Sequence, residues 1–326
     1  MAARLAVQQD HKVTVIERDP RISEVVNTKG LTLREGKKTR VCSVRLVEEA
    51  AGDSFDALIL ATKSNGLVEA VEKLNSNLAE EGLVITTQNG LVALDLAEVI
   101  GDRFLVPGCV LWGASMDAPG VYRITASGPF IIGGLDEQAN TPAVGRGETL
   151  LSRIFPVTVS PNIRGVLWSK LAVTSTFTAM GAITGLPFGK LAASREIRDI
   201  MLTIGRELFE VSRAEGITLE SLGGGVDFER FLSDQGYSRF LKHLFMRIIG
   251  YKSRDTESSM LDSIRRGRKT EVEFINGRLV EAADRSGVPV PCNRLVVDLI
   301  RELESGKRSP KPDNLGAFRG FQRKRE

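Results

Sequence analysis

The sequence has few cysteines, and their positions suit neither cross-linking nor metal binding. Its 326 residues include only three, Cys42, Cys109 and Cys292. They are odd in number, far apart and without a CxxC spacing, which argues against a disulfide framework and against a zinc site. We therefore expect a reducing compartment, and the cytoplasm is the simplest interpretation.

Long apolar runs are missing as well. The sequence has no stretch of about 18 consecutive apolar residues that would cross a bilayer. The segment from Met1 to Asp10 is too short and too polar for a secretory signal. We expect no membrane association.

The chain also lacks an excess of charge of one sign. It carries 44 basic and 41 acidic residues, a net charge of +3, so its composition gives no reason to expect a nucleic-acid partner. The basic excess is local and follows Gly306, where prolines and glycines interrupt any helix. Residues 307–326 are therefore predicted to form a basic, flexible tail, and no nucleic-acid role is assigned to it.

What the sequence does contain suits two domains, because 326 residues exceed one ordinary small core. The first 160 residues alternate short β-branched runs with helical patterns, which is typical of parallel strands covered by crossover helices. The predicted strands are 13–17, 31–33, 57–62, 83–87 and 105–110, and the predicted helices between them are 21–27, 67–78 and 92–100. Further runs at 121–125, 130–133 and 157–159 predict an antiparallel addition at the sheet edge.

From residue 164 onward the strand signals disappear. Helical periodicities follow at 164–183, 194–215, 227–250, 254–286 and 292–304. The predicted fold class is α/β: a Rossmann-like, doubly wound domain over residues 1–160, followed by an all-helical domain over 161–306. Long amphipathic helices could bury a partner's equivalent surface, which is compatible with a homodimer.

The start of the chain departs from the usual opening of a nucleotide-binding domain. Such a domain begins with a strand, a GxGxxG turn and a helix, whereas here residues 1–9 resemble that helix and residues 11–18 resemble the second strand. The first strand would lie centrally, and its loss would orphan backbone groups at roughly 1–3 kcal/mol each. A total stability of about 5–15 kcal/mol cannot absorb that cost. We expect the native product to start upstream, so that the first domain is incomplete here.

Four segments of the chain form a distinctive set of motifs. The most specific is Leu167-Trp168-Ser169-Lys170-Leu171-Ala172-Val173. The others are Ser258-Ser259-Met260-Leu261-Asp262 with Thr270-Glu271 and Ile275-Asn276-Gly277, then Ala61-Thr62-Lys63, and Gln88-Asn89-Gly90. Together these segments resemble the ketopantoate reductase family, whose LWxKLAxN segment is similar to the first of them, and the resemblance covers about residues 1–304.

This resemblance implies reduction of a 2-keto acid, which needs a hydride donor, a proton donor and a grip on the carboxylate. Lys170 resembles the family's proton donor, although a lysine taken alone is usually a solvated helix residue. Glu271 resembles the carboxylate that orients the lysine and contacts cofactor or substrate hydroxyls. Ser259 resembles a hydroxyl that grips the substrate, against the alternative of a helix cap.

The resemblance also implies a nicotinamide dinucleotide. Arg18 follows the second strand, where an arginine accommodates the 2′-phosphate and an acid binds the ribose hydroxyls, so we expect NADPH even though Glu17 precedes it. Lys63 and Asn89 lie at the carboxyl ends of successive predicted strands and would flank the nicotinamide, as would Ala114. Asn89 would also contact the substrate.

Several positions depart from the family pattern. Where the family has asparagines that hold ketopantoate, this chain has Thr174, Thr178 and Phe188, with Thr256 replacing a further asparagine near the serine pair. The threonines stay candidate substrate contacts, but Phe188 removes a polar group that would discriminate between substrates. Two alternatives therefore stay open: reduction of a more apolar 2-keto acid, or a non-catalytic descendant that only binds a ligand. Trp112 stands where the family has a histidine, and a core tryptophan is the ordinary explanation.

Overall fold

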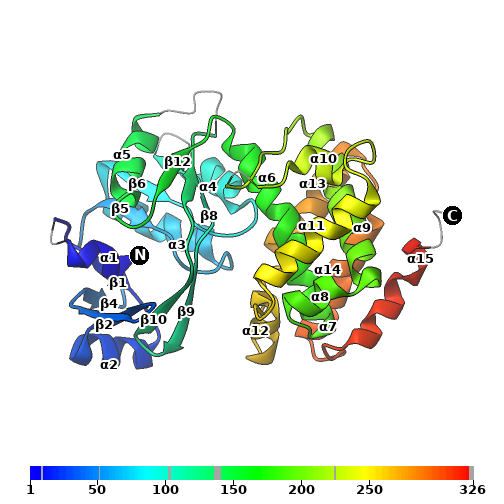
Figure 1. Ribbon diagram of the computed structural model, residues 1–326. Coiled ribbons are helices and arrows are strands. Elements are labelled where there is room, and N and C mark those ends of the chain that lie inside the picture. The colour runs from blue at the N-terminus through cyan, green and yellow to red at the C-terminus, as the bar shows by residue number, and fades with distance from the viewer. Residues whose placement is uncertain (9, 51, 102–103, 136–140, 224, 323–326) are drawn as a thin grey trace. The chain divides into compact units, whose positions relative to one another are not determined.

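The structure is a computed structural model that describes residues 1–8, 10–50, 52–101, 104–135, 141–223 and 225–322. Contacts divide the chain into two compact units. The first unit comprises Met1–Thr62, Gly66–Gln88 and Ala93–Ile163, and the second comprises Lys63–Asn65, Asn89–Val92 and Arg164–Glu326. Figure 1 labels most of the helices and many of the strands.

Strands of the first unit form four hydrogen-bonded groups within the described residues: β1 with β4, then β3-β2-β10-β9, β12-β11-β8 and β5-β6-β7. The strands are parallel in the pairs β1–β4, β5–β6, β6–β7, β2–β10 and β11–β12. The strand bounds are Thr14–Ile16 (β1), Leu31–Glu35 (β2), Lys38–Cys42 (β3), Arg45–Val47 (β4), Phe55–Ile59 (β5), Leu78–Ile85 (β6), Leu105–Val106 (β7), Gly108–Val110 (β8), Gly113–Ala118 (β9), Val121–Ala126 (β10), Phe130–Ile132 (β11) and Val157–Val159 (β12).

Helices cover these strands through apolar faces. The helices are Ala2–Val7 (α1), Pro20–Lys29 (α2), Leu67–Leu74 (α3), Val92–Ile100 (α4) and Pro142–Leu151 (α5), with a 3₁₀ turn at Asn75–Asn77 (η1). One core joins strand residues such as Ile85, Phe130 and Ile132 to Val144 and Leu151 of α5. A second core packs α1 and α2 against β2 and β3. Burial of such side chains is the main favourable term in the unit's folding.

The arrangement of strands differs in part from the expected sheet. The run at 121–125 pairs with β2 in parallel and with β9 in antiparallel fashion, and β11 pairs with β12 in parallel. Strands β1 and β5 belong to different groups, and no described strand is hydrogen-bonded between them.

The second unit is helical, as predicted. Its elements are Ile163–Val173 (α6), Thr174–Thr178 (η2), Ala179–Thr184 (α7), Phe188–Ala193 (α8), Arg195–Ala214 (α9), Phe228–Leu232 (α10), Arg239–Lys252 (α11), Ser259–Arg265 (α12), Glu273–Gly277 (η3), Arg278–Ser286 (α13), Pro291–Glu304 (α14), Pro312–Phe318 (η4) and Arg319–Gln322 (α15). The continuous stretch Ile163–Thr184 is long and apolar enough to cross a membrane by composition, but its apolar window is 89% buried, as in the core helix of a globular unit.

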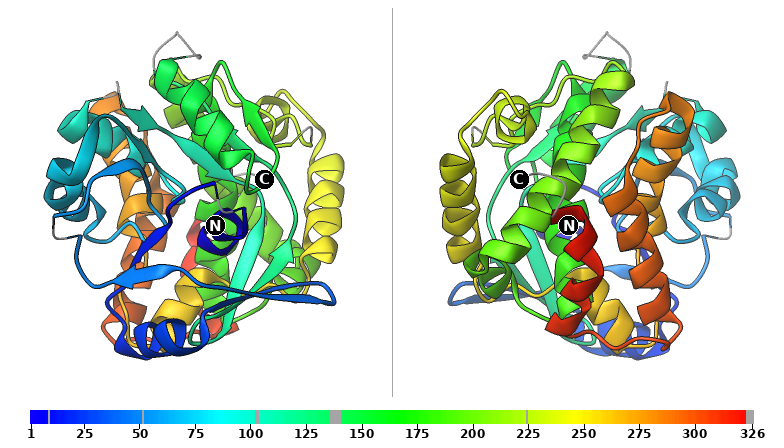
Figure 2. Two further views of the ribbon diagram at one scale, coloured as in Figure 1. Left: turned by 90° about the vertical axis from the view of Figure 1, so that its left-hand side faces the viewer. Right: turned by 90° about the vertical axis from the view of Figure 1, so that its right-hand side faces the viewer.

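The C-terminal segment differs from the flexible tail expected from its charge. Pro312–Phe318 forms a 3₁₀ helix, Arg319–Gln322 continues it, and the Phe318 side chain is fully buried. The segment contacts α7 and α9, against which Figure 2 shows it in red. The apolar Leu315 and Phe318 outweigh the surrounding basic residues because their burial removes apolar surface from water. Residues 323–326 lie outside the described part of the chain.

None of the three cysteines forms a disulfide, and all three are buried. Cys42 and Cys109 lie in the first unit, and Cys292 lies in the second. Burial raises the pKa of the Cys42 thiol, and it raises that of Cys292 further, beyond the range in which the thiol ionises in ordinary buffers.

Candidate functional site

The turn after β6 is tied to the end of β5, so the sequence motifs at these two strand ends lie side by side. The Thr87 hydroxyl donates to the Leu60 carbonyl at 2.5 Å. The Gln88 amide donates to the carbonyls of Leu60 and Thr62 at 3.0 and 2.9 Å. The glutamine of the Gln88-Asn89-Gly90 motif therefore fixes the strand end that leads into Lys63.

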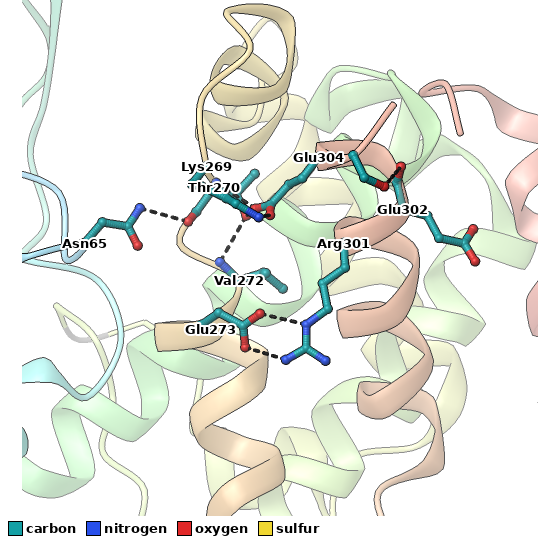
Figure 3. Close-up of polar contacts among 9 residues, drawn as sticks. Asn65, Lys269, Thr270, Val272, Glu273, Arg301, Glu302 and Glu304 are labelled. Atoms are coloured by element: carbon teal, nitrogen blue, oxygen red, sulfur yellow. Dashed lines mark hydrogen bonds and ion pairs between the residues drawn. The ribbon is translucent and has the colours of Figure 1, made fainter. Parts of the chain in front are cut away.

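Residues Lys63–Asn65 bind the segment around Glu271, within the second unit. Lys63 Nζ donates to Ser263 Oγ on α12 at 2.5 Å. The backbone N–H and the hydroxyl of Ser64 both donate to Glu271 Oε1, at 3.1 and 2.9 Å. Asn65 donates to the Thr270 carbonyl at 3.1 Å, which Figure 3 shows. The structure thus packs the segment that begins with Lys63 against the segment that carries Glu271, and it is Ser64, the residue after Lys63, that bonds the Glu271 carboxylate.

Glu271 is only 8% exposed, and Ser64 is 1% exposed. Such burial is tolerated because the carboxylate accepts two hydrogen bonds, one from a backbone amide and one from a hydroxyl. The sequence analysis did not identify Ser64 or Asn65. Both residues follow directly after Lys63 at a predicted strand end, and this position could have marked them as candidate site residues.

A second set of contacts fixes the loop that carries Glu271. Glu304 of α14 accepts from the backbone N–H and the hydroxyl of Thr270, at 2.8 and 2.7 Å, and from Lys269 at 3.0 Å. Glu273 forms a bidentate pair with Arg301 at 2.8 Å, as Figure 3 shows. Burial alone would raise the pKa of Glu304, but the hydrogen bonds from Thr270 and Lys269 outweigh it and lower the pKa.

Asn89 and Gly90 pack on the same region of the second unit. Asn89 is half-buried. Gly90 has φ +89°, and a Cβ at this position would lie under 3.0 Å from the carbonyl oxygen of Phe274 in η3. A side chain is therefore excluded both by the backbone conformation and by this close approach. The motif's glycine allows the Asn89 turn to sit directly on η3.

Lys170 lies near the end of α6 and is half-buried. Its ammonium makes no hydrogen bond or ion pair with any residue that the structure describes. Thr174 and Thr178 follow at intervals of four, on the helix face of Lys170, and are 6% and 9% exposed. The Thr174 hydroxyl donates to the carbonyl of Lys170 at 3.1 Å, so it is engaged with its own helix.

The helix that carries Lys170 continues as a π-helix, η2, over Thr174–Thr178. A π-helical turn leaves backbone carbonyls poorly paired and is frequent at functional sites. Here the side chain of Asn276, from the second π-helix η3, donates to the Ser175 carbonyl at 3.2 Å and to Asn293 Oδ1 at 3.0 Å. Asn276 and Asn293 are both fully buried.

Glu207 of α9 completes this network at the start of α14. Its carboxylate accepts from the backbone N–H groups of Cys292 and Asn293, both at 2.9 Å, and from the Asn293 amide at 2.8 Å. It thereby caps a helix whose own N-cap residue, Val290, has no capping side chain. Desolvation raises the Glu207 pKa, although these hydrogen bonds oppose the shift.

The two serines of the Ser258-Ser259 pair have different environments. Ser258 is 1% exposed and is the N-cap of α12: its hydroxyl accepts from the Leu261 N–H at 3.2 Å and donates to the Thr178 carbonyl at 2.6 Å. Ser259 is exposed. The capping role that was the alternative for Ser259 therefore belongs to its neighbour, and the Ser259 hydroxyl stays a candidate ligand.

The remaining candidates lie in the first unit. Arg18 is exposed just after β1, and the structure describes no ion pair to it. Glu17 precedes Arg18 and could instead have bound ribose hydroxyls. Its Oε1 accepts hydrogen bonds from the backbone N–H groups of Arg18 and Asp19, both at 2.9 Å. Ala114 is exposed on β9. Trp112 stacks on Phe155 with ring centroids 4.7 Å apart, which is a core role.

Comparisons with known proteins identify the family of the chain. A family model described as "Ketopantoate reductase PanE/ApbA" matches residues 1–137, and one described as "Ketopantoate reductase PanE/ApbA C terminal" matches residues 162–304. The 2-dehydropantoate 2-reductase of Pyrococcus abyssi is 30% identical over 90% of either chain. That of Aquifex aeolicus is 24% identical over 76% of either chain.

Solved structures show the same fold. A PanE/ApbA family ketopantoate reductase from Ralstonia eutropha superposes with a TM-score of 0.79 at 26% identity, covering 94% of both chains. A D-mandelate dehydrogenase, solved with NADH and anilino(oxo)acetate, gives a TM-score of 0.78 at 18% identity, covering 93% of this chain and 94% of its own. Sequence and structure together establish that this chain belongs to the ketopantoate reductase family of nicotinamide-dependent 2-keto acid reductases.

Proposed function

We propose that the protein reduces 2-dehydropantoate (ketopantoate) to pantoate with NADPH, a step of pantothenate biosynthesis, in the cytoplasm. The observation that carries this proposal is the state of Lys170. Its ammonium is half-buried and has no partner among the described residues, while the family's most specific motif surrounds it. An unpaired ammonium on a fixed helix is available to a substrate carbonyl.

The reaction consumes one hydride and one proton. The reduced nicotinamide, when bound, supplies the hydride to the carbonyl carbon. Lys170 donates its proton to the carbonyl oxygen, which becomes the hydroxyl, and the neutral amine takes up a proton from solvent afterwards. Before transfer, the same ammonium stabilises the negative charge that develops on the oxygen.

Other residues of the second unit would bind and orient the substrate. Asn89 and Ser259 carry hydrogen-bonding groups that can bind the carboxylate and the substrate hydroxyl. Thr178 adds a further hydroxyl, whereas Thr174 contributes less because its hydroxyl is bonded to the Lys170 carbonyl. Glu271, whose side chain is held by the two hydrogen bonds from Ser64, would orient the ammonium.

The residues for the cofactor fit a phosphorylated dinucleotide. The Arg18 guanidinium is exposed and free of described carboxylates, and Glu17 accepts from backbone amides instead of presenting both oxygens to a ribose. An arginine in this place favours a 2′-phosphate. Lys63 and Ala114 would border the nicotinamide end, with Lys63 held by Ser263.

Replacement of Lys170 by methionine tests the proposal. Methionine keeps the length of the side chain but removes the proton and the charge, so kcat for ketopantoate should fall by roughly 10²–10⁴-fold, with NADPH binding retained. Lys190→Met, at an exposed lysine of α8, is the matched control and should leave kcat unchanged. Unchanged turnover of Lys170→Met would refute the assignment.

A second candidate is the reduction of a more apolar 2-keto acid. Phe188 stands at a position where the family has an asparagine, and its ring contacts that of Phe177 with centroids 5.3 Å apart. Phe177 also borders an apolar cavity of about 60 Å³. Steady-state assays over a panel of keto acids distinguish the two candidates, since ordinary efficiency with ketopantoate removes the second.

The non-catalytic alternative is tested by cofactor titration. Fluorescence of NADPH on addition of the protein should show saturable binding if the chain is an enzyme. A flat titration would favour a protein that has kept the fold but not the reaction.

A further inference from the structure

A depression on the surface of the second unit combines two arginines with hydrogen-bonding side chains. Its volume is about 370 Å³, and it lies between the C-terminal part of α9, helix α10 and the loop that follows α10 (Figure 1). Arg213 comes from α9 and Arg230 from α10, while Ser233 and Gln235 come from the loop. None of these four is among the residues proposed to bind the keto acid or the cofactor. The depression therefore offers a second place for a small ligand.

The two arginines of this depression are not neutralised by a carboxylate. Neither Arg213 nor Arg230 forms an ion pair with any residue that the structure describes. By contrast, Arg206, Arg239 and Arg301 of the same unit each have a carboxylate oxygen at 2.8 Å. A guanidinium does not lose its proton in proteins, so both side chains keep their charge. The depression thus holds two positive groups that are available to an anion.

Each of the two guanidinium groups lies over an aromatic ring. The Arg213 guanidinium carbon is 5.8 Å from the centroid of the Phe209 ring, and that of Arg230 is 4.9 Å from the centroid of the Tyr237 ring. A cation–π contact attracts the charge to the ring without using the N–H donors. Those donors match the oxygens of a phosphate, which a guanidinium can bind through two parallel hydrogen bonds.

The carboxylates at the depression already have partners. Glu229, which lines it, accepts from the Leu219 N–H at 2.7 Å. Asp234, which lies in the loop, is paired with Arg206 at 2.8 Å. Two positive side chains and one negative side chain therefore line the depression, and its net charge is positive. Such a surface attracts anions.

The loop after α10 is held in place, so its donors are positioned before a ligand arrives. The Ser233 carbonyl accepts from Lys242 Nζ at 2.7 Å, and the Ser233 hydroxyl accepts from the Gln235 N–H at 3.1 Å. A Cβ on Gly236 would lie under 3.0 Å from the Arg230 carbonyl oxygen, so only a glycine lets the loop approach α10 this closely. Preorganised groups bind more tightly because less conformational freedom is lost on binding.

These features fit the phosphate group of a small metabolite. Two guanidinium groups match the charge of a phosphate monoester, which is close to two negative units at neutral pH. The Ser233 hydroxyl and the Gln235 amide add neutral donors. We propose that this depression is a binding site for a phosphate group, carried by a small metabolite or free in solution. The inference goes beyond the proposed reduction and does not depend on it.

Isothermal titration calorimetry of the full chain tests the site, with glycerol 3-phosphate and inorganic phosphate as probes at constant ionic strength. Glycerol 3-phosphate should bind saturably to the wild type. Arg213→Gln and Arg230→Gln should each weaken this binding about tenfold, because each removes charged hydrogen bonds. Arg247→Gln is the matched control and should bind like the wild type, because Arg247 is an exposed arginine of α11 without an ion pair in the described chain. Circular dichroism should be unchanged in all three variants.

The two probes distinguish the sources of phosphate. Tighter binding of glycerol 3-phosphate would identify an ester as the ligand, and equal binding of inorganic phosphate would identify the free ion.

Three results would overturn the proposal. One is the absence of saturable binding for both probes. A second is equally tight binding of succinate, which would remove the preference for phosphate. The third is binding that both arginine variants retain and Arg18→Ala loses, which would place the phosphate at the residue proposed for the cofactor.

Discussion

Replacing Asn276 by leucine should weaken both stability and substrate binding, because this residue joins the two π-helices. Its amide donates to the Ser175 carbonyl and to Asn293 Oδ1 in a fully buried place. Leucine would orphan both acceptors, at about 1–3 kcal/mol each. The side-chain oxygen of Asn276, Oδ1, has no hydrogen-bond partner among the described residues. Its removal therefore offsets part of the stability that the two lost hydrogen bonds would cost. The net decrease in the free energy of unfolding should be about 2–4 kcal/mol.

The functional effect should exceed what lost stability explains. The Ser175 carbonyl lies inside η2, between Thr174 and Thr178, which we propose to face the substrate. A shift of this turn should raise KM for the keto acid about tenfold, equivalent to ~1.4 kcal/mol of binding. KM for NADPH should change little. Urea unfolding and steady-state kinetics of the same preparation measure the two effects separately.

A matched control is available in Asn314, which is also buried and donates to two carbonyls, those of Ile183 and Ser309. Asn314→Leu should lose comparable stability but leave KM for the keto acid unchanged. If both variants raise KM equally, or if Asn276→Leu does not raise it, the positioning role assigned to Asn276 is refuted.

Gly90→Ala should lower the free energy of unfolding by about 2–4 kcal/mol, because a positive φ and a clash with η3 act together; Gly216→Ala, with φ +71° and open space around it, should cost only ~1 kcal/mol in the same urea titration. Arg18→Ala should raise KM for NADPH about tenfold but not KM for NADH, and an equal rise for both would show that Arg18 does not select the phosphate. Glu304 has a lowered pKa in the folded state, so its contribution to stability is present above its unfolded pKa of about 4.3 and is lost as pH falls through the folded value. Thermal unfolding between pH 3 and 6 should therefore show that the melting temperature of Glu304→Gln falls less steeply with falling pH than that of the wild type. Parallel plots of melting temperature against pH would contradict this.

The sequence predicted the elements whose patterns are local. The β-branched runs of the first unit and the amphipathic periodicity of the second correspond to strands and helices in the structure. It missed the strands β3, β4 and β9 and the helix α5. The residues Lys38–Val41 of β3 are charged or exposed, and the glycines of α5 lower its helix propensity. Neither π-helix was predicted, because an i→i+5 turn inside a longer helix leaves no separate periodicity.

The candidate site was only partly predictable for a different reason. Lys63, Glu271 and Lys170 were predicted from motifs and stay predictions as site residues, whereas the contact between Ser64 and Glu271 joins residues 207 positions apart. No spacing rule relates such residues, because their proximity depends on how the chain folds back. The C-terminal segment was misjudged because its basic residues dominate the composition, whereas the buried Phe318 decides its packing.

The burial of the cysteines makes them natural reporters of local opening. A thiol that is shielded from solvent does not react with alkylating reagents until the surrounding structure opens. Cys42 and Cys109 would record opening of the α/β unit, and Cys292 that of the helical unit. Peptide-resolved alkylation during denaturant titration can therefore show whether the two halves of the chain melt together or one after the other, without any introduced label.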